Sequence, residues 1–261
     1  MKAINKTIIV ALIVGGFILL GCSNPASFDP KPGTPLPTEF TVPDFSGVAD
    51  GTLLSELGYE VVSSDTPGGN PLDVPGFVVN GEVIESDSDD LAGWFDFATP
   101  EFEIDRNENG GVIVEWEVRY PESIPSGNSE RAKFYLRLTD SEGTNLYRFL
   151  FKPYVGADQT NFNLELAKDS TDPETSLQQV RSRDIDPSYT PTGPSAPWIN
   201  FKFKLEASGE ITLLIDDVVF MSGVTDSNHS LFSKVKFTYR TTNDAKNYTI
   251  QIRNLSVLPL E

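Results

Sequence analysis

A strict alternation of apolar and polar residues limits the fold of this chain more than any other feature of its sequence. Over Gly111–Tyr120, apolar side chains occupy every second position, while Glu115, Glu117 and Arg119 fall on the opposite face. The same alternation recurs at Ala132–Thr139, Thr160–Lys168, Trp198–Glu206, Glu210–Phe220, Ser233–Arg240 and Tyr248–Leu258. Successive side chains of a strand point to opposite faces, so this period of two predicts half-buried antiparallel strands.

The segments between the predicted strands favour turns. Asn107–Gly111, Asp140–Gly143 and Ala207–Gly209 are short and contain glycine, and only Leu53–Leu57 suggests a helical turn. Cys22 is the only cysteine, so stability must come from a buried core and not from disulfides. Many closely spaced strands without disulfides predict an all-β fold, in which two antiparallel sheets form a β-sandwich.

The N-terminal segment differs in composition from the predicted strands. Lys2 and Lys6 precede an apolar run, Thr7–Leu20, that ends at Leu19-Leu20-Gly21-Cys22. A basic start before an apolar run of this length is typical of a secretory signal. The four last residues resemble the cleavage site of bacterial lipoproteins, which implies cleavage before Cys22 and its acylation. Ser23 stands where an aspartate would retain such proteins in the inner membrane, so the resemblance implies location in the outer membrane.

A proline-rich stretch follows the predicted cleavage site. Residues 23–39 contain five prolines, and prolines at this density favour an extended tether over a helix. The sequence therefore predicts three parts: a signal peptide at 1–21, an acylated cysteine and tether at 22–39, and one β-sandwich domain at 40–261. Acyl chains on Cys22 would attach a soluble domain to the membrane without spanning it.

The charge balance of the chain is strongly acidic. The formal net charge is −18, and removal of residues 1–21 takes away two lysines and no acidic residue, which leaves −20. A surface of this sign repels phosphate groups, so neither nucleic acid nor an anionic lipid surface is expected as a partner of the domain.

Three segments resemble laminin-G-like or concanavalin A-like domains of bacteria. Phe45–Thr52 with Gly58–Val61 is similar to their opening strands, Gly209–Asp217 to a hairpin strand, and Tyr248–Val257 to the closing strand. The resemblance implies the jelly-roll form of the sandwich. Asp217 stands where these domains usually have a glycine, which predicts a looser turn at this position.

One acidic segment resembles a catalytic strand. Glu103-Ile104-Asp105-Arg106-Asn107-Glu108 has the E-x-D-x-x-E spacing of laminarinase- and agarase-type glycoside hydrolases. The resemblance would make Glu103 the nucleophile, Asp105 its support and Glu108 the acid/base. Arg106 and Asn107 replace apolar residues of that family, and Asn109-Gly110-Gly111 predicts a turn that places Glu108 on a loop. We therefore interpret the segment as the edge of a hairpin and expect no catalytic residues.

Evidence for a metal site is weak in the sequence. His229 is the only histidine, which excludes zinc sites with several histidines. The carboxylates of Asp87-Ser88-Asp89-Asp90 and of Asp216 and Asp217 could bind a structural calcium ion, but solvated acidic loops are the simpler interpretation. No other cofactor is expected.

Basic residues are scarce, yet they gather on the polar faces of predicted strands beside Tyr135 and Trp198. Aromatic rings beside planar hydrogen-bonding groups are typical of sugar sites, and Arg or Lys would suit a uronate or a sulfate. The expected ligand contacts are Tyr135, Arg137, Arg148, Trp198, Lys202 and Lys204. The sequence thus predicts a non-catalytic, outer-membrane-anchored lipoprotein that binds a polysaccharide. An acidic polysaccharide would suit the basic side chains. A hydrolase or lyase of the same fold, or a structural envelope protein whose charges only prevent edge association, are the alternatives.

Overall fold

The computed structural model describes residues 35–66, 68–88, 91–121, 132–155, 160–168, 175–181, 197–242 and 249–260. The predicted signal peptide, Cys22 and the first part of the tether lie outside the described residues. No helix within the described part of the chain is long and apolar enough to cross a membrane.

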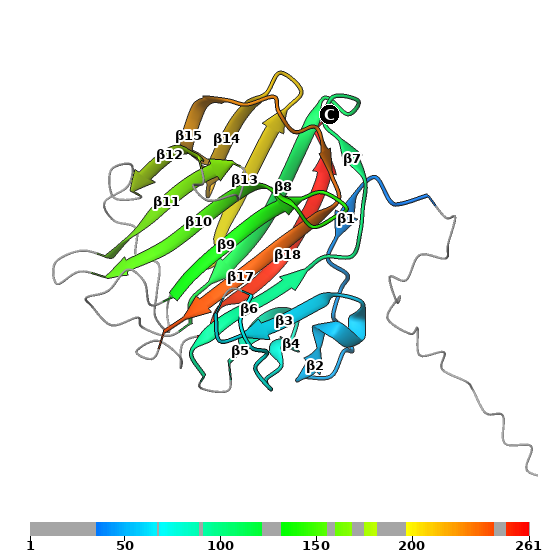
Figure 1. Cartoon of the computed structure of the whole chain (residues 1–261), viewed down its shortest axis with the longest axis vertical. Coiled ribbons are helices and arrows are strands. Elements are labelled where there is room, and N and C mark those ends of the chain that lie inside the picture. The colour runs from blue at the N-terminus through cyan, green and yellow to red at the C-terminus, as the bar shows by residue number, and fades with distance from the viewer. Residues whose placement is uncertain are drawn as a thin grey trace, which may run out of the picture.

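Two antiparallel sheets lie one over the other, as the sequence predicted (Figure 1). The larger sheet has nine strands in the order β15-β14-β13-β8-β18-β5-β4-β2, with β1 paired to β18. Its strands are β1 (Phe40–Thr41), β2 (Thr52–Leu53), β4 (Gly76–Asn80), β5 (Val83–Asp87), β8 (Gly111–Arg119), β13 (Ile199–Glu206), β14 (Glu210–Ile215), β15 (Val218–Thr225) and β18 (Gln251–Pro259).

The smaller sheet has seven strands in the order β12-β11-β10-β9-β17-β6-β3. These are β3 (Glu60–Ser64), β6 (Gly93–Ala98), β9 (Ala132–Thr139), β10 (Asn145–Val155), β11 (Thr160–Lys168), β12 (Thr175–Arg181) and β17 (Lys234–Thr241). A short pair, β7 (Ile104–Asp105) with β16 (Leu231–Phe232), forms a separate two-stranded sheet, and a 3-10 turn, η1 (Leu54–Leu57), occupies the predicted helical position.

The core lies between the two sheets and is rich in aromatic rings. Alternate residues of β8 and β13 are buried, which confirms the period of two read from their sequences. Trp116 of β8 stacks on Phe201 of β13 at a centroid distance of 5.1 Å, and it meets Phe149 of β10 and Phe237 of β17 from the opposite sheet. The apolar faces therefore hold the sheets together, and the polar faces of both sheets point outward.

The hairpin at Asp216 and Asp217 differs from the prediction. The alternation at Glu210–Phe220 crosses a chain reversal, because β14 ends at Ile215 and β15 begins at Val218. Asp216 and Asp217 adopt φ values of 48° and 63°, and a two-residue turn of type I′ requires positive φ at both central positions. The connection is therefore tight, since aspartate tolerates this conformation better than most residues with a Cβ.

Candidate functional site

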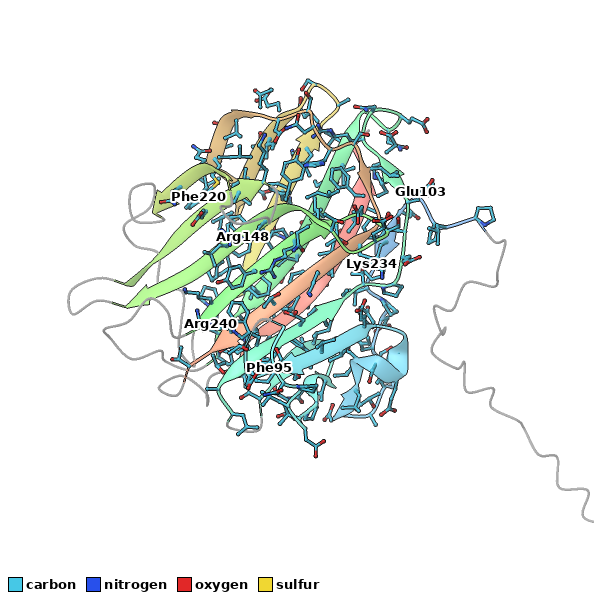
Figure 2. The ribbon with its side chains drawn as sticks, in the orientation of Figure 1. Phe95, Glu103, Arg148, Phe220, Lys234 and Arg240 are labelled. Carbon is cyan, nitrogen blue, oxygen red and sulfur yellow. The ribbon has the colours of Figure 1, made fainter. Side chains whose placement is uncertain are left out.

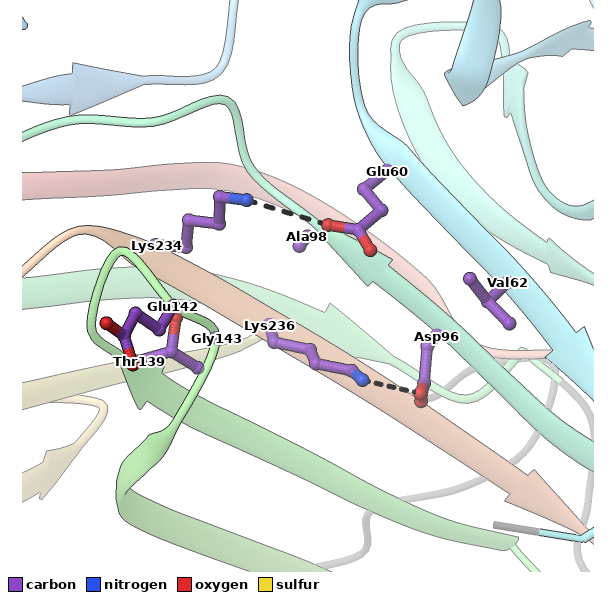
Figure 3. A pocket seen from close by; sticks show the side chains of 9 residues that line it. All are labelled: Glu60, Val62, Asp96, Ala98, Thr139, Glu142, Gly143, Lys234 and Lys236. Atoms are coloured by element: carbon purple, nitrogen blue, oxygen red, sulfur yellow. Dashed lines mark ion pairs between the residues drawn. The ribbon is translucent and has the colours of Figure 1, made fainter. Parts of the chain in front are cut away.

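A groove runs over the outer face of the seven-stranded sheet. Its first part is a hollow of about 250 Å³, lined by Glu60, Val62, Asp96, Ala98, Thr139, Glu142, Gly143, Lys234 and Lys236 (Figure 3). Its second part is a hollow of about 380 Å³, lined by Val62, Ser63, Ser64, Gly68, Gly69, Pro71, Trp94, Asp96, Arg137, Asn145, Lys236 and Thr238. The two hollows share Val62, Asp96 and Lys236, so they adjoin on this sheet face, and together they are called the groove below.

Strand alternation explains why these side chains face the groove. In β6 the buried Phe95 and Phe97 point into the core, so Trp94 and Asp96 point outward. The register of β17 places Thr238 opposite both Asp96 of β6 and Tyr135 of β9. Residues far apart in the sequence thus meet on one polar face, which spans β3, β6, β17 and β9.

The first hollow contains paired charges. Lys236 Nζ lies 2.8 Å from Asp96 Oδ2, and Lys234 Nζ lies 3.3 Å from Glu101 and 3.6 Å from Glu60. Figure 3 shows these two lysines pointing toward their carboxylates along the floor, with the turn between β9 and β10 beside them. Partly exposed ion pairs contribute little to stability, but they fix the positions of charged groups that a ligand would meet.

Two oxygen atoms of this hollow lack hydrogen-bond partners. Asp96 Oδ1 and Thr139 Oγ1 are buried, and neither makes a hydrogen bond within the chain. Buried acceptors are nearly always satisfied by protein, water or ligand. The hollow therefore offers hydrogen-bonding capacity that the folded chain itself does not use.

A stack of aromatic rings and guanidinium groups borders the second hollow. Trp94 and Tyr135 stack at a centroid distance of 5.8 Å with an interplanar angle of 25°. The Cζ atoms of Arg137 and Arg148 lie 4.8 and 5.7 Å from the Tyr135 ring, and that of Arg240 lies 5.0 Å from the Trp94 ring. We call Trp94, Tyr135, Arg137, Arg148 and Arg240 the arginine–aromatic stack.

The stack is held in place by strand register and by further contacts. Arg240 lies opposite Trp94, and Arg148 lies opposite Arg137, on neighbouring strands. Arg137 donates a hydrogen bond to Thr238 Oγ1, and Arg148 donates one to Glu165 at 3.4 Å. A cation over an aromatic ring contributes about 0.5–1 kcal/mol when exposed and more when desolvated. The contacts thus orient several guanidinium planes on one sheet face.

The six residues predicted to bind ligand do not form one site. Tyr135, Arg137 and Arg148 come together in the stack, and Figure 2 shows Arg148 and Arg240 on the layer formed by β10 and β17. Trp198 precedes β13, and Lys202 and Lys204 lie on the outward-facing side of that strand. Because β13 belongs to the nine-stranded sheet, these three residues lie on the opposite face of the sandwich.

Contacts within the protein engage Trp198. The Cζ atoms of Arg253 and Arg119 lie 4.2 and 5.0 Å from its ring. Arg253 donates to Glu117 through Nε at 2.7 Å and approaches it through Nη2 at 2.6 Å, and Arg119 donates twice to Gln251 Oε1. The guanidinium groups that cover the ring are thus bonded to neighbouring strands, which indicates a structural network across β8 and β18.

Lys202 is likewise paired within the protein. Its Nζ donates to Asp217 Oδ1 at 2.8 Å and lies 3.6 Å from Glu115. The hydrogen bond to Asp217, together with both carboxylate charges, raises the pKa of Lys202, and the same bond lowers the pKa of Asp217. This lysine therefore joins β13 to the turn that follows β14.

The acidic segment at Glu103 leads into a turn, as the sequence indicated, but it is not the edge of a hairpin, because β7 pairs with β16 and not with β8. β7 contains only Ile104 and Asp105, and Asp105 Oδ1 then accepts a hydrogen bond from the Asn107 backbone at 2.9 Å. Figure 2 shows Glu103 at the margin of the molecule, away from Arg240. Glu103 and Glu108 are exposed, and none of Glu103, Asp105 and Glu108 lines the groove.

Two of the candidate calcium ligands, Asp216 and Asp217, bond to other groups of the chain. Asp216 Oδ1 accepts a hydrogen bond from the Asn200 backbone at 3.0 Å, and Asp217 is bound to Lys202. Asp89 and Asp90 lie outside the described residues. Within the described ranges, no three His, Cys, Asp or Glu side chains are grouped closely enough to hold a metal ion. The His229 ring packs edge-on against Tyr147 at 5.5 Å.

Sequence reasoning missed the residues that connect the groove to the stack. Trp94 and Asp96 lie in Gly93–Ala98, a six-residue segment with the same alternation as the longer strands. Lys236 and Arg240 lie in a stretch that was correctly predicted as a strand, yet its polar face was not considered. Trp94 could have been found from the alternation of its own strand, but its proximity to Tyr135 could not.

The chain matches no family model and no curated protein sequence. Among solved structures, the CBM2 module of the evolved Dit of Lactobacillus casei BL23 phage J-1 aligns with a TM-score of 0.56 and 11% identity, over 87% of this chain and 99% of that module. The carbohydrate recognition domain of Emp47p aligns with a TM-score of 0.54 and 9% identity, over 88% and 99% of the two chains.

A sialidase also aligns, with a TM-score of 0.51 and 11% identity over 87% of this chain. This chain covers only 19% of the sialidase, so the similarity concerns one part of that protein. At such low identity these structures share the fold alone with this chain. The domain is therefore a concanavalin A-like jelly-roll β-sandwich, of the architecture found in lectin-like domains.

Proposed function

We propose that this protein is a non-catalytic polysaccharide-binding lipoprotein, and that the groove is its ligand-binding site. The observation that carries the proposal is the combination, on one sheet face, of two adjoining hollows with the arginine–aromatic stack. Binding sites are concave, and sugars are held by aromatic surface together with a few polar groups of fixed geometry. The groove supplies both, with Trp94 and Val62 as apolar surface and Asp96 and Thr139 as acceptors.

The names of the similar structures support a saccharide as the class of ligand. Two of the similar structures are named as a CBM2 module and as a carbohydrate recognition domain, and both are matched over nearly their whole length. The fold by itself does not determine a ligand. It makes a saccharide the natural class of ligand to test first.

We further propose that the polysaccharide is acidic. The chain carries a net charge of −18, yet Arg137, Arg148 and Arg240 gather around Trp94 and Tyr135, and Lys133 lies opposite Arg240 in the strand register. A guanidinium that stacks on a ring keeps its N–H groups in its own plane, parallel to the ring, and at its edge they can bond a carboxylate or sulfate in a bidentate manner. Concentrated positive charge on one face would attract an anionic chain despite the acidic remainder.

The membrane attachment that we propose rests on the sequence. The apolar run and Leu19-Leu20-Gly21-Cys22 support export and acylation, and Ser23 supports location in the outer membrane. The tether would then hold the sandwich away from the lipid surface, where a polymer could reach the groove.

Variants on the two sheet faces test which face binds. The chain from Ser23 onward would be titrated calorimetrically with oligosaccharides of a polyuronate, a sulfated galactan and a neutral glucan. We expect Trp94→Ala to weaken binding about two- to tenfold, which corresponds to about 0.5–1.5 kcal/mol of lost ring contact. Lys204→Ala, on the outer face of the other sheet, is the matched control and should bind normally.

Two results would contradict the proposal. Loss of binding in Lys204→Ala or Trp198→Ala, with normal binding in Trp94→Ala, would place the ligand on the nine-stranded sheet. Absence of binding to all three oligosaccharides would leave the structural envelope role as the better explanation.

A further inference from the structure

The two ends of the groove differ in charge. The first hollow is lined by three carboxylates, those of Glu60, Asp96 and Glu142, and by two lysines, Lys234 and Lys236. Both lysines lie within 3.6 Å of carboxylates, so their charge is largely balanced. The described residues that line this end comprise three carboxylates and two lysines, so its net charge is slightly negative.

The other end is positive. Arg137 lines the second hollow beside Trp94, and Arg148, Arg240 and Lys133 lie around the same pair of rings. Among the described residues on this part of the sheet face, the carboxylates are Asp96, which is paired with Lys236, and Glu165, which is paired with Arg148. Within the described lining of the second hollow, Arg137 and Lys236 stand against the single carboxylate of Asp96, so this end is slightly positive.

These two ends suit different sugar residues. At the negative end, Asp96 Oδ1 and Thr139 Oγ1 have unused capacity to accept hydrogen bonds, which hydroxyl groups of a neutral sugar could donate. A uronate or sulfate at that end would meet Glu60, Asp96 and Glu142, and like charges placed together cost several kcal/mol. At the positive end the same anionic group would meet stacked guanidinium groups.

We propose that the groove selects a heteropolysaccharide in which acidic and neutral sugar residues adjoin. The acidic residue binds beside the arginine–aromatic stack, and the neutral residue binds in the hollow between Asp96 and Thr139. This inference rests on the proposed function, because it assigns a ligand class to the same groove. Selectivity comes from repulsion at one end as well as from attraction at the other.

Oligosaccharides of equal length distinguish the alternatives. Hyaluronan oligosaccharides, in which a uronate and a neutral amino sugar alternate, would be titrated against the chain from Ser23 onward, in parallel with oligogalacturonate and dextran oligosaccharides. We expect the alternating oligosaccharide to bind at least about tenfold more tightly than either homopolymer, because only it satisfies both ends. Its affinity should fall with added salt, since the stack contacts are screened.

Carboxylate variants locate the selectivity. The double variant Glu60→Gln and Glu142→Gln should raise the affinity for oligogalacturonate about tenfold relative to that for dextran, because it removes repulsion without removing Asp96. Glu210→Gln, at an exposed carboxylate of β14 in the other sheet, is the matched control and should change neither. A thermal unfolding scan of each variant confirms that the sandwich remains folded.

The outcomes of these titrations distinguish the selectivity of the groove from polysaccharide binding itself. Equal affinity for oligogalacturonate and hyaluronan oligosaccharides, or no gain for oligogalacturonate in the double variant, would overturn the selectivity and leave polysaccharide binding in place. Absence of binding to all three oligosaccharides would overturn the inference together with the proposed function.

Discussion

Replacing Trp116 by phenylalanine should destabilise the protein much less than replacing it by alanine. Trp116 is fully buried, and its ring stacks on Phe201 with an interplanar angle of 8°. Phe149 and Phe237 meet it from the other sheet at centroid distances of 6.0 and 6.4 Å. Its indole Nε1, however, is buried and has no hydrogen-bond partner. Packing of the buried Trp116 ring therefore stabilises the fold, whereas burial of its unpaired N–H group destabilises it.

The magnitudes follow from these two terms. Trp116→Ala removes the whole ring system from the middle of the core, and such changes cost about 3–5 kcal/mol. Trp116→Phe keeps a six-membered ring against Phe201 and removes three heavy atoms, a loss of about 2 kcal/mol at about 0.8 kcal/mol for each buried methylene-sized group. It also removes the unpaired N–H, whose burial costs about 1–3 kcal/mol. The two terms nearly cancel, so Trp116→Phe should lie within about 1 kcal/mol of the parent chain.

Urea unfolding followed by far-ultraviolet circular dichroism measures both variants on the chain from Ser23 onward. Equal m-values would show that the denatured states are comparable, so the midpoints then report stability. If Trp116→Phe lost as much stability as Trp116→Ala, the reasoning would be refuted, because Nε1 would then have a partner such as an internal water molecule.

Two further predictions concern the anchor and a surface ion pair. Cys22→Ala should abolish acylation and remove the protein from the membrane fraction, and normal partition of this variant would contradict the lipoprotein assignment. The pKa of Asp217 is lowered by Lys202, so their contact stabilises the fold above the unfolded pKa of Asp217, and this contribution is lost as the pH falls through its lower folded pKa. Asp217→Asn should therefore flatten the acid side of the stability curve slightly, and an unchanged acid side in urea titrations would show that the pair contributes nothing.

The sequence predicted the local features of the fold well. The bounds of β9 and β11 agree with the predicted Ala132–Thr139 and Thr160–Lys168. This success has a local cause, because alternation is a property of neighbouring residues and one buried face is enough to impose it. The tightness of the turn within Glu210–Phe220 escaped prediction, because Asp216 and Asp217 adopt the positive φ values that usually require glycine.

The candidate site could be predicted only in part, because it depends on strand order. Alternation indicated that Tyr135 and Lys202 face outward, and both strands have such a polar face. It could not indicate that β9 pairs with β10 and β17, whereas β13 pairs with β8 and β14. These pairings separate Lys202 from Tyr135 and bring Trp94 to Tyr135, although 40 positions separate the two rings in the chain.

Both outer faces of the sandwich place guanidinium groups over a tryptophan, so this motif alone does not identify a ligand site. Around Trp198, Arg253 is bonded to Glu117 and Arg119 to Gln251, and the contacts join adjacent strands of the nine-stranded sheet. Around Trp94 the stack borders a groove whose floor includes an unpaired oxygen of Asp96. An arginine whose partners lie within the sheet stabilises that sheet, whereas one beside a groove with unused acceptors can also contact a ligand. The environment of the two tryptophans, and not their type, therefore favours the seven-stranded sheet as the binding face.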